Sequence, residues 1–289
     1  MRWCRALALV LAMLPLATFA GPSAQEGEAL SSPASPAAAA QRLTFFHMNI
    51  AGHMQHAGRT ENIAPAVISS ITSSWPSVVS LQEVCEQQFA KILLEVNRLG
   101  GRYDARFAHS DESRNPCNGG FYGDVLMTRG VNNTWDERHL PAMDGEERKL
   151  ICVNTGFAVR IMACAAHLAP VERQKKLEVM GWIGKYFLIP FAQVGAPAVF
   201  LGDTYLTPDE MSFLTGGLFA HTVRGNTYNN PNCTRIPAYT SGKFKCPGPS
   251  TIQYDYIMVS TNKFSGWSGA VTSTKWSDHL PVRGAATVR

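Results

Sequence analysis

Hydrophobic and polar positions follow two different periods along most of the chain. Short runs rich in β-branched and aromatic residues predict strands, and apolar positions three or four residues apart predict helices. The predicted strands cover 43–50, 77–81, 103–108, 123–128, 149–154, 156–167, 198–201, 253–259, 266–272 and 282–288. The predicted helices cover 61–75, 86–99, 171–188 and 208–214. Because no internal repeat divides this mixture, the pattern favours one layered α/β domain.

Two connections and one terminal segment complete the predicted organisation. Thr155 and Gly156 stand between two predicted strands, which indicates a tight hairpin at this dipeptide. Residues 216–249 are rich in turn-forming residues and contain few periodic positions, so we expect an irregular loop there. Residues 21–41, rich in Ser, Pro and Ala, predict a flexible leader. The folded domain is therefore expected to cover 42–289.

The first twenty residues have the pattern of a secretory signal peptide. Arg2 and Arg5 form a basic start, residues 6–16 are apolar, and small residues around Ala20 provide a cleavage point after it. The apolar run is shorter than the roughly 20 residues that a helix needs to cross a bilayer. No other stretch of the chain is long enough to cross a bilayer either. We expect a signal peptide at 1–20, a secreted or periplasmic protein and no transmembrane segment.

Composition and charge exclude extremes but select no partner. The chain has 289 residues, of which 45% are hydrophobic and 17% charged, so it is not a disordered, collagen-like or fully membrane-embedded protein. Its formal net charge is +4, from 26 basic and 22 acidic residues. Removal of Arg2 and Arg5 with the signal leaves 24 basic residues and a net charge of +2. That total indicates neither a polyanion nor a membrane surface as the partner.

The cysteine count also changes once the signal is removed. Cys4 leaves with the signal, and an even set of six remains, namely Cys85, Cys117, Cys152, Cys164, Cys233 and Cys246. In an exported chain such a set favours disulfides over free thiols, and no CxxC spacing indicates zinc. Fifteen pairings of six cysteines exist. We predict that neighbours in the sequence pair, because each pairing then closes a modest loop.

Seven polar residues fall at the ends of predicted apolar strands, where a sheet can present side chains to a shared site. They are Asn49, Glu83, His167, Asp203, Asp255, Asp278 and His279. Taken singly, each has an ordinary structural explanation, such as a turn former, a helix cap or a core histidine. Together, four carboxylates, two histidines and an amide suit the binding of a hard divalent cation and proton transfer near neutral pH.

The local sequences around these residues resemble the ordered motifs of the endonuclease/exonuclease/phosphatase superfamily, the DNase I-like proteins. The motifs are Met48-Asn49-Ile50, Leu81-Gln82-Glu83-Val84, Ala166-His167-Leu168, Leu201-Gly202-Asp203, Tyr254-Asp255-Tyr256-Ile257 and Ser277-Asp278-His279-Leu280-Pro281-Val282. The second and last are the most specific, and the resemblance runs from about residue 43 to the C-terminus. It implies a two-sheet β-sandwich flanked by helices, in four layers.

The resemblance also implies Mg²⁺-dependent hydrolysis of phosphate esters, with Mn²⁺ as an alternative ion. Glu83 would hold the metal, with Asn49 beside it and Asp278 nearby for the phosphate or a second ion. Mg²⁺ keeps several waters and needs only one or two carboxylates. We expect Asn49 to serve both the metal and the reaction.

The remaining motif residues would act on the water and the phosphate. Asp203 would orient or deprotonate the attacking water. His279, held by Asp255, and His167 would donate hydrogen bonds or charge to phosphate oxygens as negative charge builds in the transition state. A carboxylate behind a histidine fixes its tautomer and favours its protonated form, which is why Asp255 is paired with His279.

One position departs from the family pattern. The family usually has Gly-Asp-X-Asn, whereas Tyr205 occupies the place of the asparagine in this chain. A phenol projects further than an amide and has one donor, so activity is either lowered or adapted to an unusual substrate. Tyr122 and Asp124 lie where the resemblance places a phosphate-contacting tyrosine and a carboxylate behind His167. A glycine-rich turn entering a strand explains these two residues about as well.

These observations predict an exported phosphodiesterase, and a nuclease is the leading hypothesis. A phospholipid or sphingomyelin phosphodiesterase is the alternative within catalysis, but residues 216–249 lack a clear apolar cluster for a membrane surface. The third hypothesis is a catalytically weak DNase I-like binding module, because Tyr205 replaces the usual asparagine. The expected partner is a phosphate-ester substrate, a nucleic acid before a phospholipid, and the expected state is a monomer.

Overall fold

In the computed structural model, which describes residues 40–110, 117–222, 227 and 253–289, twelve strands form two six-stranded sheets. The first sheet has the order β11 (Phe264–Val271), β12 (Val282–Val288), β1 (Arg42–Asn49), β2 (Val78–Cys85), β4 (Tyr122–Thr128) and β3 (Asp104–His109). The second has the order β5 (Val131–His139), β6 (Lys149–Gly156), β7 (Arg160–His167), β8 (Ala198–Asp203), β10 (Asp255–Ser260) and β9 (Phe219–His221). The described residues belong to one compact unit.

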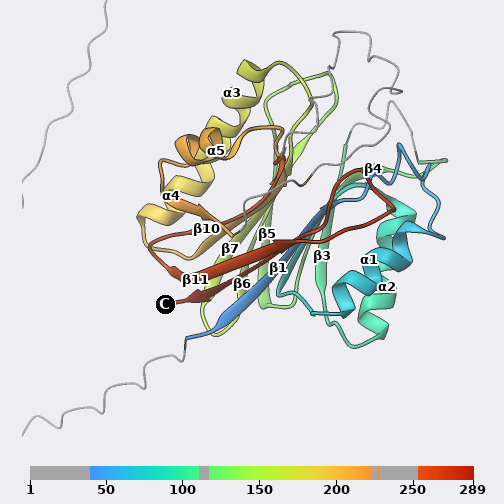
Figure 1. Cartoon of the computed structure of the whole chain (residues 1–289), viewed down its shortest axis with the longest axis horizontal. Helices are drawn as coiled ribbons and strands as arrows, with labels where there is room; N and C mark the ends of the chain where they lie inside the picture. Colours follow the sequence, from blue (N-terminus) through green and yellow to red (C-terminus); the bar gives the residue numbers. More distant parts are fainter. Residues whose placement is uncertain (1–39, 111–116, 223–226, 228–252) are drawn as a thin grey trace, which may run out of the picture. The chain divides into compact units, whose positions relative to one another are not determined.

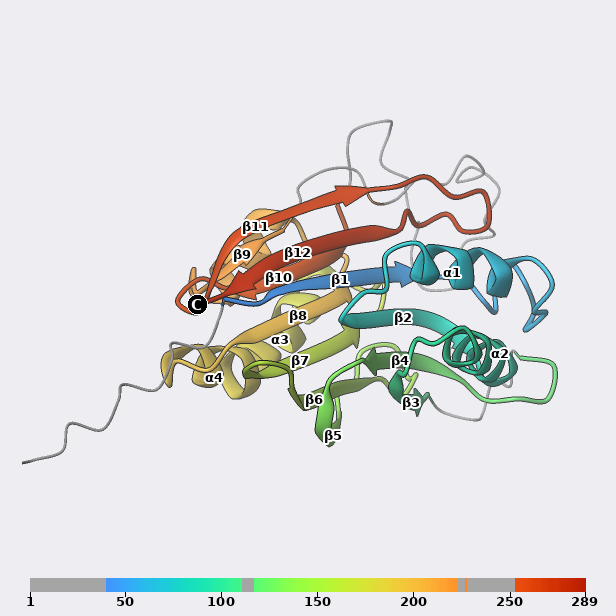
Figure 2. The ribbon, with the colours of Figure 1, turned by 90° about the horizontal axis from the view of Figure 1, so that it is seen from below.

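The two sheets pack face to face, and helices cover both outer faces (Figures 1 and 2). Helices α1 (Ile63–Thr72) and α2 (Glu86–Arg98) lie against the first sheet. Helices α3 (Arg173–Ile183), α4 (Ile189–Gln193) and α5 (Pro208–Leu214) lie against the second. Alternate side chains of one strand serve different layers, since Phe45 of β1 joins the core between the sheets and Phe46 joins the core under α1 and α2. The predicted four-layer sandwich is therefore confirmed.

The predicted hairpin at Thr155 and Gly156 is wrong by a few residues. β6 continues through Gly156, and the turn lies at 157–159, where the Phe157 N–H donates to the carbonyl of Val159 at 3.0 Å. Thr155 is fully buried and its hydroxyl contacts Thr128 at 3.3 Å. The dipeptide resembles a turn in the sequence, but a buried hydroxyl with a partner lets it remain in the strand.

The sequence pattern missed two strands and overextended one helix. β5 is an edge strand whose residues are mostly exposed, so it has no apolar alternation to detect. β9 has only three residues. The predicted helix at 171–188 consists of α3 followed by a π-helical turn, Gly184–Leu188, that leads into α4. The predicted signal peptide, most of the leader, Cys233 and Cys246 lie outside the described residues.

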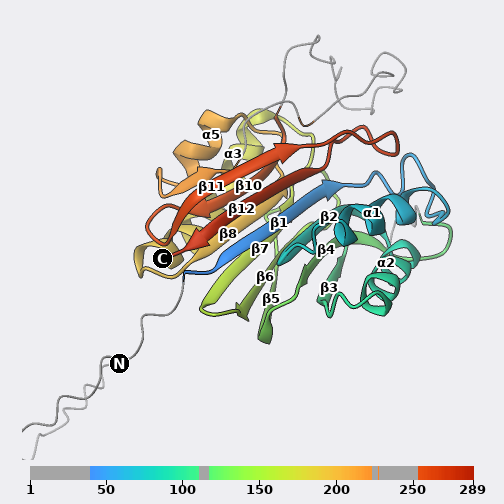
Figure 3. The same ribbon diagram turned by 60° about the horizontal axis from the view of Figure 1, so that its bottom comes forward.

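The strand order brings motif-bearing ends together. β1 and β2 run parallel in the first sheet, and β7 and β8 run parallel in the second. Figure 3 shows β12, β1 and β2 side by side, with α1 and α2 beside them. The carboxyl ends of parallel strands meet at the same edge of a sheet, which places Asn49, Gln82, His167 and Asp203 at such edges. No helix among the described residues is long and apolar enough to cross a membrane.

Candidate active site

Three adjacent strands of the second sheet present their functional residues in register. His167 at the end of β7 pairs with Asp203 at the end of β8, and Asp203 pairs with Asp255 at the start of β10. Gly202 precedes Asp203, and a Cβ added to it would lie 2.4 Å from the carbonyl oxygen of Ala166. The close approach of β7 and β8 therefore requires the glycine of the Gly-Asp motif. This packing determines the backbone position of Asp203, the next residue.

Asp203 is the residue on which the other motif side chains converge. It is fully buried, and its Oδ2 accepts a hydrogen bond from Asn49 Nδ2 at 3.2 Å. The same oxygen lies 3.8 Å from His167 Nε2 and 3.6 Å from His279 Nε2. Burial raises the pKa of Asp203 well above its usual value, with His279 and Asn49 opposing the shift. A carboxyl group with a raised pKa accepts a proton more readily near neutral pH.

Glu83 faces Asp203 from the first sheet. Asn49 Nδ2 also donates to Glu83 Oε1 at 3.0 Å, so one amide group connects the two carboxylates. Glu83 has a φ of 55°, and the pairing of β2 with β4 shifts register between Leu81 and Val84. Such a bulge turns a side chain away from the regular alternation of a strand. Burial raises the pKa of Glu83, and Asp278 raises it further.

Gln82 connects the two sheets beneath this site. Its Nε2 donates to the carbonyl oxygen of Ala166, and its Oε1 accepts from the backbone N–H of Asp203 at 2.9 Å. Gln82 is fully buried, so both bonds lie away from water. Gln82 belongs to the Leu81-Gln82-Glu83-Val84 motif, but the sequence predicted no role for it. Its neighbour Glu83 is the ionisable residue of the pair, while Gln82 links the two sheets through its two hydrogen bonds.

Asp255 is hydrogen-bonded by two histidines. Its Oδ2 accepts from His279 Nδ1 at 2.9 Å, and its Oδ1 accepts from His47 Nε2 at 3.0 Å. Burial opposes charge on both partners, but Asp255 and Asp203 outweigh it and raise the pKa of His279 to about 10. His279 and His47 in turn hold the pKa of Asp255 below its usual value despite burial. His279 is therefore a buried cation at neutral pH, and the predicted pairing of Asp255 with His279 is present.

His167 is held by a cation rather than by a carboxylate. Arg148 Nη1 lies 3.1 Å from His167 Nδ1, whereas Asp124 Oδ1 lies 3.8 Å from it. A guanidinium has no acceptor, so Arg148 donates, and His167 carries its proton on Nε2. Burial and Arg148 lower the pKa of His167 well below its usual value. Its Nε2 lies 3.9 Å from Glu83 Oε1 and makes no hydrogen bond among the described residues.

Arg148 was not recognised in the sequence because it lies at no strand end and in no motif. It is buried, and its Nη2 donates to Glu146 at 2.8 Å and to Asp144 at 3.3 Å. Burial lowers its pKa, but Glu146, Tyr122 and Asp144 outweigh burial and the pKa is raised. The charge of Arg148 is thus balanced locally through Nη2, and its Nη1 orients His167.

The other predicted site residues lie around this centre. Asp124 accepts from the Glu83 backbone N–H at 3.3 Å, and burial raises its pKa to about 7. Tyr122 is near Glu83 and Glu146, which together with burial raise its pKa well above the usual value. Asp278 is half-buried, and its Oδ1 accepts from Gln55 at 2.8 Å.

Tyr205 departs from the family pattern in conformation as well as in identity. It has a φ of 53°, in the left-handed region that bulky residues rarely adopt. Its ring centre lies 6.2 Å from that of His167 and 5.0 Å from that of Tyr254. Thr204 is fully buried, and its hydroxyl accepts from the Leu206 N–H at 3.4 Å. Tyr205, and not Thr204, is therefore the residue beside the site.

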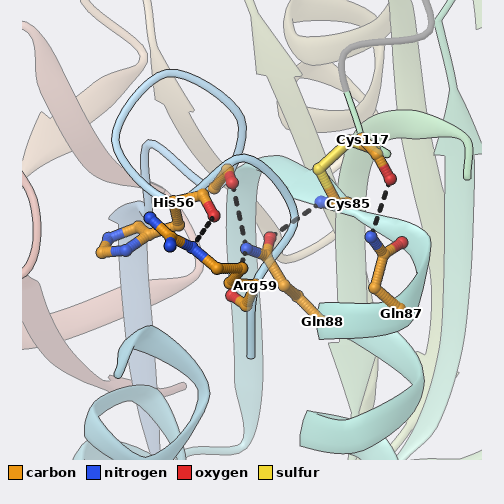
Figure 4. Close-up of a disulfide and its surroundings, with 7 residues drawn as sticks. His56, Arg59, Cys85, Gln87, Gln88 and Cys117 are labelled. Carbon is orange, nitrogen blue, oxygen red and sulfur yellow. Dashed lines mark hydrogen bonds between the residues drawn. A yellow bond between two sulfur atoms is a disulfide. The ribbon is translucent and has the colours of Figure 1, made fainter. Parts of the chain in front are cut away.

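A disulfide and a glutamine fix the loop behind Glu83 (Figure 4). Cys85, two residues after Glu83, is bonded to Cys117 with a Cα separation of 5.5 Å. Gln88 Oε1 accepts from the Cys85 N–H, and its Nε2 donates to the carbonyls of Gly52 and Arg59, each at 3.0 Å (Figure 4). The Gly52 N–H donates to the carbonyl of Glu83 at 2.8 Å. These bonds hold the strained backbone of Glu83 in place.

The second predicted disulfide is distant from the chemistry. Cys152 and Cys164 are bonded across the paired strands β6 and β7. Both are buried in the core beneath α3 and α4. Two of the three predicted pairings are therefore present, and the third, between Cys233 and Cys246, concerns residues outside the described ranges.

The donor set fits a hard divalent cation. Asp203, Asp255 and His279 place one ligand atom each within 4.8 Å of one another. Both oxygens of Asp255, however, accept hydrogen bonds from histidines, which makes this trio less suited to a cation. Glu83 and Asp203 are the carboxylates that remain for a cation, and both accept a hydrogen bond from Asn49 Nδ2, at 3.0 and 3.2 Å. Asp203 Oδ1 is buried without a hydrogen-bond partner in the described part of the chain.

Comparison with known proteins identifies the fold. No family model matches the sequence, and no curated protein matches it. Among solved structures, truncated Caenorhabditis elegans TDP2 matches 85% of this chain and 97% of its own, with a TM-score of 0.64 and 16% identity. An endonuclease/exonuclease/phosphatase from Beutenbergia cavernae matches over 86% and 72%, with a TM-score of 0.63 and 20% identity. D. rerio TDP2 complexed with single strand DNA product matches over 86% and 99%, with a TM-score of 0.60 and 16% identity.

The sheets, their helical cover and these likenesses define the fold. The chain has the DNase I-like fold that its ordered motifs predicted, and it shares this fold with TDP2 and with the Beutenbergia cavernae endonuclease/exonuclease/phosphatase. Within this fold, the six motifs contribute the residues that surround Asp203 in the geometry described above.

Proposed function

We propose that this protein is a secreted, Mg²⁺-dependent phosphodiesterase that hydrolyses nucleic acid. The observation that carries the proposal is the convergence of Asn49, His167 and His279 on one oxygen of Asp203. Two carboxylates, one cationic histidine and one neutral histidine make a site that handles an anion and a water together. The likeness to a TDP2 complexed with single strand DNA product supports a nucleic acid as the substrate.

Each residue has a role that follows from its surroundings. Asp203, with its raised pKa, accepts a proton from the attacking water. His279, cationic because of Asp255, contacts a phosphate oxygen as charge develops, and His167 donates from Nε2. Glu83 would hold the metal, with Asp278 and Asn49 beside it. When bound, a divalent cation stabilises negative charge on the phosphoryl oxygens.

Two disulfides and the predicted signal peptide support an exported protein. Disulfides form and persist in oxidising compartments such as the periplasm and the extracellular space. Cys85–Cys117 and Cys152–Cys164 are both present in the folded domain. The same chemistry could act on a phospholipid headgroup, so the test includes that substrate.

The test measures hydrolysis of plasmid DNA, RNA, sphingomyelin and bis(p-nitrophenyl) phosphate by the purified protein with Mg²⁺. We expect cleavage of nucleic acid and of the aryl diester, and a loss of roughly 10²–10³-fold in Glu83→Gln. Glu86→Gln is the matched control, because Glu86 is exposed at the start of α2. Hydrolysis of sphingomyelin alone would replace the nuclease by a lipid phosphodiesterase. Hydrolysis of none of the four would leave a binding module.

A further inference from the structure

A lysine outside every sequence motif lies beside the site. Lys176 is half-buried on the first turn of α3. Its Nζ lies 5.8 Å from the centre of the Tyr205 ring, in the geometry of a cation–π contact. Asp203 and Glu210 both act on its charge and favour the ammonium form, while burial lowers its pKa. The ammonium group therefore lies against the Tyr205 ring, and it interacts electrostatically with Asp203 and Glu210.

Tyr205 is fixed well enough to support this lysine. Its ring packs near His167 and Tyr254, with centres 6.2 and 5.0 Å away. A backbone held at a φ of 53° is kept there by its surroundings, and such positions cluster at functional sites. The replacement of the usual asparagine therefore brings in a rigid ring.

The charge balance of the site leaves a role for another cation. The cationic His279 is paired with Asp255, and Arg148 is engaged by Asp144 and Glu146. Among the described residues, Glu83 and Asp203 are the acids of the centre that have no cation of their own. A phosphodiester approaching these carboxylates is repelled unless cations compensate. Glu210, the other acid near Lys176, accepts hydrogen bonds from Thr207 and Arg173. Asp203 is thus the acid near Lys176 that belongs to the catalytic centre.

We propose that Lys176, supported by the ring of Tyr205, is a substrate-binding residue that contacts the phosphate of a phosphodiester next to Asp203. This inference rests on the proposed phosphodiesterase function and adds a binding group to it. The family pattern implies an asparagine amide near the phosphate at the position of Tyr205. In this chain Lys176 of α3 lies against the Tyr205 ring, and its ammonium group supplies the hydrogen-bond donor and the positive charge.

The first experiment compares kcat/KM for bis(p-nitrophenyl) phosphate with Mg²⁺. Lys176→Gln should lower it roughly 10- to 100-fold. Lys175→Gln is the matched control, because Lys175 is exposed on the same helix and carries the same charge. Tyr205→Leu and Tyr205→Asn should both lower kcat/KM, and Lys176→Gln combined with Tyr205→Leu should lose no more than the worse single variant. Losses that multiply, or a faster Tyr205→Asn enzyme, would overturn the inference.

A second experiment separates this inference from the proposed function. Inorganic phosphate is titrated into the full-length protein with Mg²⁺ by calorimetry, where no turnover is needed. Lys176→Gln should weaken phosphate binding severalfold relative to wild type and to Lys175→Gln. Equal affinities, or no saturable binding by wild type, would overturn the role of Lys176. A protein that binds phosphate through Lys176 but hydrolyses none of the diesters would keep the binding residue and refute the phosphodiesterase.

Discussion

At the scale of single residues, the site uses two histidines in opposite protonation states. His279 is charged because Asp255 and Asp203 lie against it, and His167 is neutral because Arg148 donates to its Nδ1. Both rings face the same oxygen of Asp203, at 3.6 and 3.8 Å. One side chain therefore supplies a fixed positive charge and the other a directed N–H donor. Neither state follows from the identity of the residue, because a histidine takes its charge from its neighbours.

The charge on His279 predicts how stability depends on pH. The pKa of His279 is raised from 6.5 to about 10, so its stabilising contribution is complete below pH 6.5 and is lost as the pH rises toward 10. Asp255, whose pKa is lowered from 3.8, loses its contribution only in stronger acid. His279→Gln should therefore cost about 3 kcal/mol at pH 5–6, and less at each step toward pH 10.

The measurement is urea unfolding of wild type and His279→Gln in EDTA between pH 5 and pH 10. His139→Gln is the control, since His139 is exposed in its pairing with Glu147 and should change the unfolding free energy by less than about 1 kcal/mol. A difference for His279→Gln that stays level or grows with pH would show that this histidine is not held charged by Asp255.

Sequence motifs found the polar residues that converge on Asp203 and missed the residues that position them. Asn49, Glu83 and Asp203 were predicted together because each ends an apolar strand within a recognisable motif. Arg148 and Gln82 were not given roles, because the site residues that they contact lie 19 and 84 or more positions away in the sequence. Hydrogen bonds of that kind depend on strand order and register, which residue patterns along a single chain do not contain.

At the scale of elements, the strand ends and the loop behind β2 determine the placement of Glu83. The bulge in β2 turns Glu83 toward Asp203, and the Cys85–Cys117 disulfide begins two residues later. Most helices and strands were predicted to within a few residues, since their apolar alternation is strong. β5 was missed because both its faces are largely exposed, and its nine residues lack an apolar pattern.

The two disulfides should separate stability from activity. Cys85 and Cys117 are 32 positions apart, Cys152 and Cys164 are 12 apart, and loop closure gives each bond roughly 3–4 kcal/mol of stabilisation. Replacing either pair by alanine should therefore lower the melting temperature by several degrees. Only loss of Cys85–Cys117 should also reduce hydrolysis, because that bond anchors the backbone next to Glu83.

Thermal unfolding and initial rates at a temperature where both variants are folded would check this expectation. The variant without Cys152–Cys164 is the internal control, since that bond lies in the core under α3 and α4. Equal activity of the two variants would mean that Gln88 and the Gly52 loop hold Glu83 without help from the disulfide.

At the scale of the whole molecule, the site exists because two sheets pack face to face and both contribute residues from their strand ends. Asn49, Gln82 and Glu83 come from the first sheet, and His167 and Asp203 come from the second. The fold was predictable because the order of the motifs along the chain is retained, even though solved structures of the same fold share only 16–20% of residues with it. Tyr205 is the main position at which this chain differs from the family's Gly-Asp-X-Asn motif.

The central claim is that Asp203 is the point at which this molecule activates water for phosphodiester hydrolysis. The most direct measurement is kcat for single-stranded DNA with Mg²⁺ in wild type, Asp203→Asn and the control Asp209→Asn, whose position on α5 is exposed. We predict a loss of roughly 10²–10⁴-fold in Asp203→Asn with unchanged folding by circular dichroism, and rates within about twofold of wild type in the control. A folded Asp203→Asn protein that cleaves DNA at the wild-type rate would contradict the account.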